Sequence, residues 1–356
     1  MLLYPAAFVV LCALSVRDVI AEEQTTSETE VADKGAQDDG GSRFLFVPYP
    51  VTEPAIGNGL LAGPVWMRAG PHTGAGPSLP QAYGFGGLWT DGGSRGVLAF
   101  DERAWGSDGR WQTTAIAARA DLKLKFSGLS PAGDASIGFN LHAAGGSIEV
   151  ERKLGDGPNS VAIDLFSVST RADFPGGLPP ELAREQTKEE IAGARLTWSQ
   201  DTRDEVFAPS SGHYASASLD SGLSLKWMGY GPGLGGGVLG LRAQFDVSLE
   251  HEAFYLRPYI SLRGVPALRY AGEQVGEVEA EYRFPLDSRW DIVAFGGLGA
   301  ARADLHGITG QRTVSTEGLG VRFKVQKLFG LTFGVDVARG PDGTFVYIQI
   351  GNPWSK

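Results

Sequence analysis

The chain has 356 residues, 51 of them glycine, and 31 Lys and Arg against 41 Asp and Glu give it a formal net charge of -10. An acidic chain without a basic tract is a poor candidate for nucleic-acid binding. No continuous apolar run after the first residues reaches the length of a transmembrane helix.

The first 21 residues have the pattern of a secretory signal peptide. An apolar run from Leu2 to Val16 is too short to span a bilayer as a helix, and Ala21 offers a small residue for cleavage. The single cysteine, Cys12, lies in this segment, so we expect no disulfide or thiol chemistry in the exported chain. Residues 22–42 are acidic, polar and free of aromatic residues, which predicts a disordered lead-in.

From Arg43 onward, apolar and polar residues alternate, which is typical of β-strands. The clearest segments, each with one wholly apolar face, are residues 116–126, 238–250, 277–284, 319–326 and 331–338. Short clusters of Gly, Pro, Asp and Ser separate them. The pattern predicts about 16 strands in one antiparallel meander: eight before the turn at residues 207–212, three more before Pro258, and five after Gly272.

Two all-β architectures fit such a meander: a soluble sandwich or barrel, and a transmembrane barrel. Long strands whose polar faces carry dense mixed charge do not suit a single dry core. The predicted fold class is therefore all-β, a single antiparallel transmembrane β-barrel over residues 43–356, with apolar faces toward lipid and charges toward a water-filled lumen. Tryptophans at predicted strand ends would form interfacial girdles: Trp66, Trp89, Trp105, Trp290 and Trp354.

Three stretches carry motifs that alternation does not explain. The first, WSQDTRDEVFAPSSGHY, provides Asp201, Arg203, Asp204, Phe207, Pro209 and Gly212. The second, Leu262, Arg263, Gly264 and Val265, lies within PYISLRGVPALRYAG, where prolines and glycines disfavour both helix and strand. The third, YIQIGNPW, lies near the C-terminus and provides Ile350, Gly351 and Trp354.

This ordered set resembles the BamA- and TamA-like outer-membrane superfamily, also called the bacterial surface antigen family. In that family, the first stretch is similar to Asp-x-Arg-Asp before a periplasmic turn. The second resembles Val-Arg-Gly-Phe/Tyr at the tip of the long sixth extracellular loop, and the third resembles a closing strand that ends in Ile-Gly-x-x-Trp. Members that insert or secrete proteins carry POTRA domains before the barrel, whereas only residues 22–42 lie between the predicted signal peptide and the barrel here. We therefore expect a barrel-only member of this family.

The resemblance also implies a location and a role. We expect an integral protein of the Gram-negative outer membrane with both termini in the periplasm. Its expected role is outer-membrane biogenesis, or insertion or translocation of a polypeptide or lipid. Its expected partners are outer-membrane lipid and lipopolysaccharide, the assembly machinery during insertion, and an unidentified periplasmic or secreted polypeptide. The alternative is a passive porin-like channel or a structural surface barrel.

Arg263 poses a specific electrostatic problem. If its loop folds into the barrel, an unpaired guanidinium would be costly to desolvate and needs an acid. The family often has Phe-x-Asp-x-Gly on the strand after the motif loop, with its aspartate paired with the loop arginine, but Gly297 occupies that position here. By alternation, the candidate partners are Glu279, Glu281 and Asp336. We expect a partly hydrated pair with one of them, and Gly264 to permit the tight tip.

The sequence shows only weak patterns of catalytic, metal-binding or phosphate-binding residues. The five histidines are scattered without metal-ligand spacing or a neighbouring serine set. The glycine run at residues 296–302 is not followed by a helix, as a phosphate-binding loop would be. The Glu279 and Glu281 pair is explained by a charged lumen lining. We therefore expect no catalytic residue, no cofactor and no metal.

Overall fold

The computed structural model describes residues 43–68, 81–106, 108–127, 136–177, 187–206, 208–249, 253–305, 308–324 and 332–354. The predicted signal peptide, the acidic lead-in and Phe207 lie outside these residues.

Sixteen strands form one antiparallel sheet in which every strand pairs with the next along the chain. This confirms the predicted fold class, and the division into eight, three and five strands is also as predicted. The strands are β1 (Arg43–Glu53), β2 (Gly57–Arg68), β3 (Gln81–Thr90), β4 (Arg95–Trp105), β5 (Trp111–Ser127), β6 (Ser136–Lys153), β7 (Asn159–Asp173), β8 (Lys188–Asp201), β9 (Gly212–Leu219), β10 (Gly222–Pro232), β11 (Val238–Ser248), β12 (Gln274–Pro285), β13 (Trp290–Leu305), β14 (Ile308–Lys324), β15 (Thr332–Gly340) and β16 (Gly343–Ile350).

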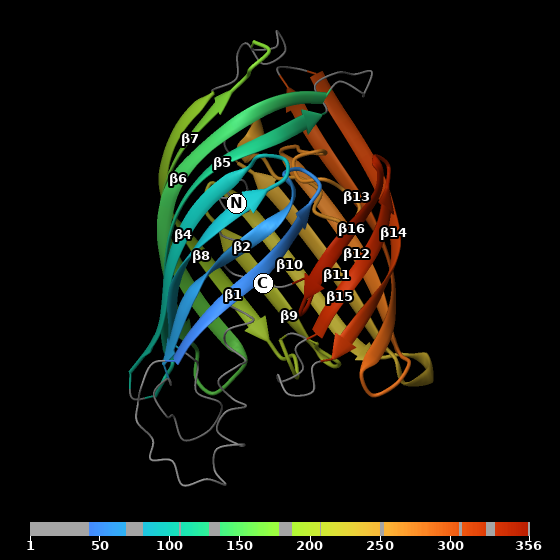
Figure 1. The fold of residues 1–356 in the computed structure, drawn as a ribbon. Helices are drawn as coiled ribbons and strands as arrows, with labels where there is room; N and C mark the ends of the chain where they lie inside the picture. Colours follow the sequence, from blue (N-terminus) through green and yellow to red (C-terminus); the bar gives the residue numbers. More distant parts are fainter. Residues whose placement is uncertain are drawn as a thin grey trace.

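The sheet curls into a barrel of tilted strands (Figure 1). Connections after odd-numbered strands lie at one end, called here the loop end, and those after even-numbered strands lie at the other, the turn end. The wall is uneven in height: β5, β6 and β7 have 17, 18 and 15 residues, whereas β15 and β16 have 9 and 8. Two 3-10 turns, η2 (Leu234–Gly236) and η3 (Phe254–Leu256), complete the described part, whose helices are all too short to cross a membrane.

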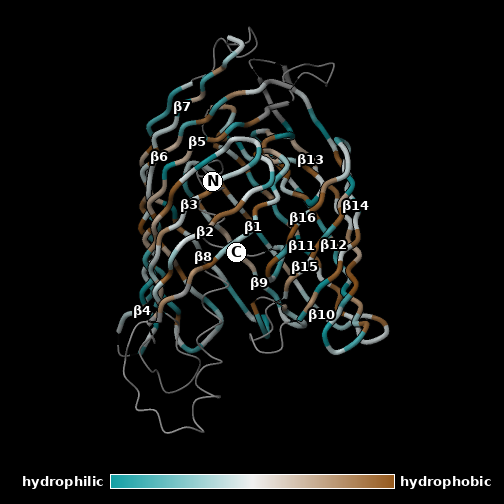
Figure 2. Tube along the Cα trace, viewed as in Figure 1, coloured by the Kyte–Doolittle hydropathy of each residue, from teal (hydrophilic) through white to brown (hydrophobic). Residues whose placement is uncertain are grey.

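The outer face of the barrel is apolar and much of its inner face is polar. On β12, Val278 is 50% exposed on the outside, while Glu277 and Glu279 on the inside are buried. Hydrophobic and hydrophilic residues alternate along the strands of the wall (Figure 2). Exposed apolar side chains with buried charges reverse the pattern of a soluble protein and define an outward apolar belt, which is the pattern of a transmembrane barrel.

The lumen also contains a hydrophobic core, on the side of β1–β7. η3 inserts Phe254 and Tyr255 there, and the Phe254 ring centroid lies 5.3 Å from that of Phe139 on β6. The expectation that the apolar face of β5 meets lipid is wrong: Leu122 is buried inside, and Lys123 is exposed outside. The physical reason is that η3 supplies an apolar surface in the lumen, and Leu122 belongs to the same hydrophobic core.

The five tryptophans predicted to form the girdles differ in where they lie. Trp89, Trp105 and Trp290 are exposed on the outer face at strand ends, as interfacial girdles require. Trp66 stacks on Tyr83 with ring centroids 5.5 Å apart. The girdle prediction is wrong for Trp354, which is buried in the lumen.

Candidate functional site

The segment between β11 and β12 enters the lumen, where we call residues 253–272 the lumen loop; in Figure 1 it runs inside the ring of strands. It doubles back as a short hairpin, in which the Ile260 N–H donates to the Tyr270 carbonyl at 3.0 Å. At its tip, the Val265 N–H donates to the Leu262 carbonyl at 3.0 Å. Gly264 has a φ of 96°, in the left-handed region that favours glycine. Arg263 is thereby held at the tip of the loop.

The structure brings Arg263 together with all three candidate carboxylates. Its Nε donates to Glu279 Oε1 at 2.8 Å, and its Nη1 donates to Asp336 Oδ2 at 2.9 Å. The same Nη1 lies 2.8 Å from Glu281 Oε2, an ion pair without hydrogen-bond geometry. The guanidinium lies 3.6 Å from the ring centroid of Phe295. A planar fork suits such a site, because it reaches several acceptors while stacking on an aromatic face.

Further arginines balance the charge of the cluster. Arg322 on β14 donates from Nη2 to Asp336 Oδ2 at 2.9 Å, and Arg283 Nε lies 3.7 Å from Glu281 Oε1. The expectation of a partly hydrated pair is wrong, since Arg263 is 8% exposed and Asp336 0%. The lumen loop itself covers the acids and keeps water away. Charges buried in this way depend on one another, because removing one leaves the others uncompensated.

Two glycines on the inner face of β13 make room for the lumen loop. A Cβ at Gly297 would lie 2.8 Å from Leu262 Cδ2, and one at Gly299 would lie 2.6 Å from Ile260 Cγ2. Gly297 is therefore a residue on which the loop packs. The acids that pair with Arg263 come from β12 and β15 instead.

The lumen loop also contacts the first and last strands. The Gly264 N–H donates to the Tyr347 hydroxyl of β16 at 3.0 Å, and the Ala267 N–H donates to Glu53 Oε1 of β1 at 3.1 Å. Arg269 Nε donates to Asp342 Oδ1, in the β15–β16 turn, at 2.7 Å. The loop thus bridges the two strands at which the sheet begins and ends.

The seam between these two strands differs from every other strand boundary. Backbone ladders join all consecutive strands, but among the described residues none joins β16 to β1. A hydrogen bond from the Ile348 N–H to Thr52 Oγ1, 2.9 Å long, crosses the seam instead. The β-barrel is therefore nearly closed, with a seam that side-chain and loop contacts hold together.

The end of the chain turns into the lumen. β16 stops at Ile350, and the predicted closing strand is therefore too long, because Gly351 adopts a φ of 71° and Pro353 lacks the N–H of a strand residue. Trp354 is buried, and its Nε1 donates to Glu279 Oε1 at 2.8 Å. Sequence reasoning missed this contact, although Gly351 and Pro353 were signals that the strand ends there.

The strand-turn motif lies at the turn end of β8. Arg203 is clamped by Asp201, with Nε to Oδ1 at 2.9 Å and Nη2 to Oδ2 at 2.7 Å. Asp204 accepts the N–H groups of Ser210 and Ser211 at 2.9 and 3.1 Å. Burial opposes its ionisation, but these hydrogen bonds prevail and hold the pKa of Asp204 below its ordinary value. Gly212 has a φ of 89° where the chain enters β9.

The motif also contacts β12, since the Pro209 carbonyl accepts a hydrogen bond from Arg283 Nη2. In the part of the chain that the structure describes, no group of three or more His, Cys, Asp or Glu is placed to hold a metal. The hydrogen bonds and ion pairs of this region hold the lumen loop to β1, β12, β15 and β16.

No protein-family model and no curated protein sequence matches the chain. Among solved structures, BamA from Haemophilus ducreyi lacking POTRA domains 1–3 is similar, with a TM-score of 0.57, 13% identity, and coverage of 88% of this chain and 70% of that one. CdiB from Acinetobacter baumannii is similar with a TM-score of 0.57 and 12% identity, covering 87% of this chain and 59% of CdiB. These likenesses confirm the predicted resemblance at the level of the fold.

Proposed function

Since the chain has the barrel fold of BamA and CdiB, we propose that it is a BamA/TamA-like protein of outer-membrane biogenesis. In this proposal it inserts or translocates a polypeptide by opening the seam between β1 and β16. It carries out no chemical step. Its partners would be outer-membrane lipid and lipopolysaccharide, the assembly machinery, and a polypeptide that is still to be identified.

The seam carries this proposal. An opened seam exposes the unpaired N–H and C=O groups of β1 and β16, which are a template for a further strand. Opening it breaks the Ile348–Thr52 hydrogen bond instead of a full backbone ladder. Neighbouring strands β15 and β16 are also short, so the apolar belt is low at this place and the lipid barrier for an entering strand is reduced.

The lumen loop gives the seam a means of control. It contacts Glu53 on β1 and Tyr347 on β16, while Arg263 anchors it to β12 and β15. Release of Arg263 would loosen both seam strands at once.

The contents of the lumen disfavour the passive-channel alternative. The lumen loop and Trp354 meet at Glu279, and η3 packs on the opposite inner wall. In planar bilayers we expect the purified chain to show little steady conductance, and Arg263→Ala to raise it. A large steady conductance that the substitution leaves unchanged would favour the porin-like function.

A reversible lock on the seam tests the proposed function. Cysteines replace Thr52 and Ile348, and the purified chain, reconstituted in liposomes, is tested for accelerating the insertion of an unfolded eight-stranded outer-membrane barrel. We expect oxidation to abolish the acceleration and reduction to restore it. The native Cys12 lies in the predicted signal peptide.

A second cysteine pair provides the control. Val337 and Val346 face each other on β15 and β16, where the ladder is already complete. Oxidising this pair should leave insertion unchanged. Full acceleration by the oxidised seam pair would contradict the proposal.

A further inference from the structure

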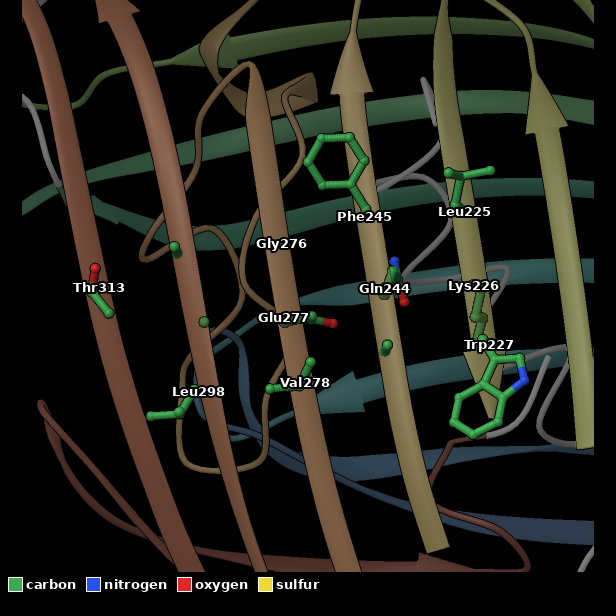
Figure 3. A pocket seen from close by; sticks show the side chains of 13 residues that line it. Leu225, Lys226, Trp227, Gln244, Phe245, Gly276, Glu277, Val278, Leu298 and Thr313 are labelled. Carbon is green, nitrogen blue, oxygen red and sulfur yellow. The ribbon is translucent and has the colours of Figure 1, made fainter. Parts of the chain in front are cut away.

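A groove of about 480 Å³ lies in the outer face of β10–β14 (Figure 3). Its volume is within the roughly 300–1,000 Å³ of small-molecule sites. The outward lining is apolar: Leu225 and Trp227 come from β10, Phe245 from β11 and Leu298 from β13. The groove therefore suits a hydrocarbon.

The strand register explains why the wall is hollow here. One row across the strands is Leu225, Phe245, Gly276 and Ala300, and the row below it is Trp227, Ala243, Val278 and Leu298. Gly276, Ala243 and Ala300 thus form a floor of small residues between bulky neighbours. A Cβ at Gly276 would meet only Phe245 Cδ2, at 3.6 Å, so the space above it is open.

A polar row closes the groove toward the loop end. On the outer face of β12, β13 and β14, the next residues toward the loop end are Gln274, Arg302 and Gln311. They pair across the sheet and are exposed. None of the ion pairs found among the described residues involves Arg302. This row marks the upper limit of the apolar belt, whose lower limit is set by Trp290 and Phe323 at the turn end.

We propose that this groove binds one acyl chain of a lipid A molecule, with Arg302 on its phosphate and Gln274 and Gln311 beside it. A cation directly above an apolar groove matches a lipid whose acyl chain carries an anionic headgroup. The proposal rests on the orientation of the loop end toward the cell exterior, where lipid A is found, and not on opening of the seam.

Native mass spectrometry of the full chain in detergent, titrated with lipid A, tests the site. We expect one retained lipid A. Gly276→Leu fills the groove, and Arg302→Gln removes the charge without touching the packing. Each should weaken binding about tenfold, which corresponds to the loss of one charge-assisted hydrogen bond or a comparable apolar contact.

Two matched variants serve as controls. Gly296→Leu adds the same side chain to the outer face of β13, two rows below Gly276, where a Cβ would be 3.4 Å from the Thr316 carbonyl oxygen. Arg119→Gln removes an exposed arginine from β5, on a different part of the wall. Both should bind lipid A as the unaltered chain does. The proposal is overturned if Gly276→Leu and Arg302→Gln also bind normally, if phosphatidylglycerol binds equally well, or if inorganic phosphate displaces the lipid.

Discussion

Arg263 contacts all three acids of the lumen cluster, and we expect the cluster to depend on it. Its removal leaves Glu279, Glu281 and Asp336 with less positive charge in a buried setting. We expect Arg263→Ala to lower the free energy of unfolding by about 3–5 kcal/mol. Arg263→Lys should recover only part of this, since an ammonium cannot fork between acids and stack on Phe295. Urea titration measures both losses of unfolding free energy, with the folded fraction read from gel electrophoresis as the heat-modifiable band.

Arg269 offers a comparison on the same loop. Its pair with Asp342 is more open, with both side chains 19% exposed, so Arg269→Ala should cost about 1 kcal/mol. Equal losses for the two alanine variants would refute a dominant role for Arg263.

We expect Asp204 to make the β8–β9 turn sensitive to acid. Its folded pKa is lowered, so its contribution to stability is present above the unfolded value of about 3.9 and is lost as the pH falls through the folded value. We expect unfolding curves recorded between about pH 6 and 2 to show a loss of unfolding free energy below about pH 4. The Asp204→Asn variant should lack this loss. Parallel curves for the two proteins would count against this.

The sequence identified the residues of the cluster better than their arrangement. Alternation along β12 and β15 indicated Glu279, Glu281 and Asp336 as lumen-facing, because it reports the face of a strand. It could not show that all three meet one arginine, since that depends on how far the loop descends. The contact between Trp354 and Glu279 was missed because the two residues are distant in sequence.

At the scale of elements, the lumen loop packs closely on β13 because glycines on the inner face of that strand leave room for it. Gly297→Asp would introduce a carboxylate where Leu262 packs and add a fourth acid to the cluster. We expect a loss of about 1–3 kcal/mol, from overpacking alone, and a smaller loss for Gly297→Ala. Thermal unfolding followed by heat-modifiability compares them. Stabilisation by Gly297→Asp would show that the loop can shift toward β13.

The polarity of β5 shows what an alternating pattern leaves open. Leu122 and Lys123 fall on opposite faces as predicted, but which face meets lipid depends on what fills the lumen. η3 packs on Phe139 in the same lumen core as Leu122, and the alternation along β5 does not show such a long-range contact. The strands themselves were predictable because alternation and turn residues are local.

At the scale of the whole molecule, the proposed orientation places the turn end in the periplasm. A cysteine at Asp156, in the exposed β6–β7 turn, should resist a membrane-impermeant maleimide in intact cells. A cysteine at Gly176, after β7 at the loop end, should react, and its added Cβ meets no atom within 4 Å. The reverse labelling pattern would show that the barrel has the opposite orientation in the membrane.

The central claim is that a polypeptide enters the membrane at the β1–β16 seam. Photo-crosslinking with benzoylphenylalanine at Val346 on β16 tests it directly, with Leu165 on β7 as a control of similar exposure, 55% against 59%. During insertion of an unfolded barrel protein, we predict crosslinks from Val346 and none from Leu165. Equal crosslinking at both positions, or none at Val346 while insertion proceeds, would contradict the account.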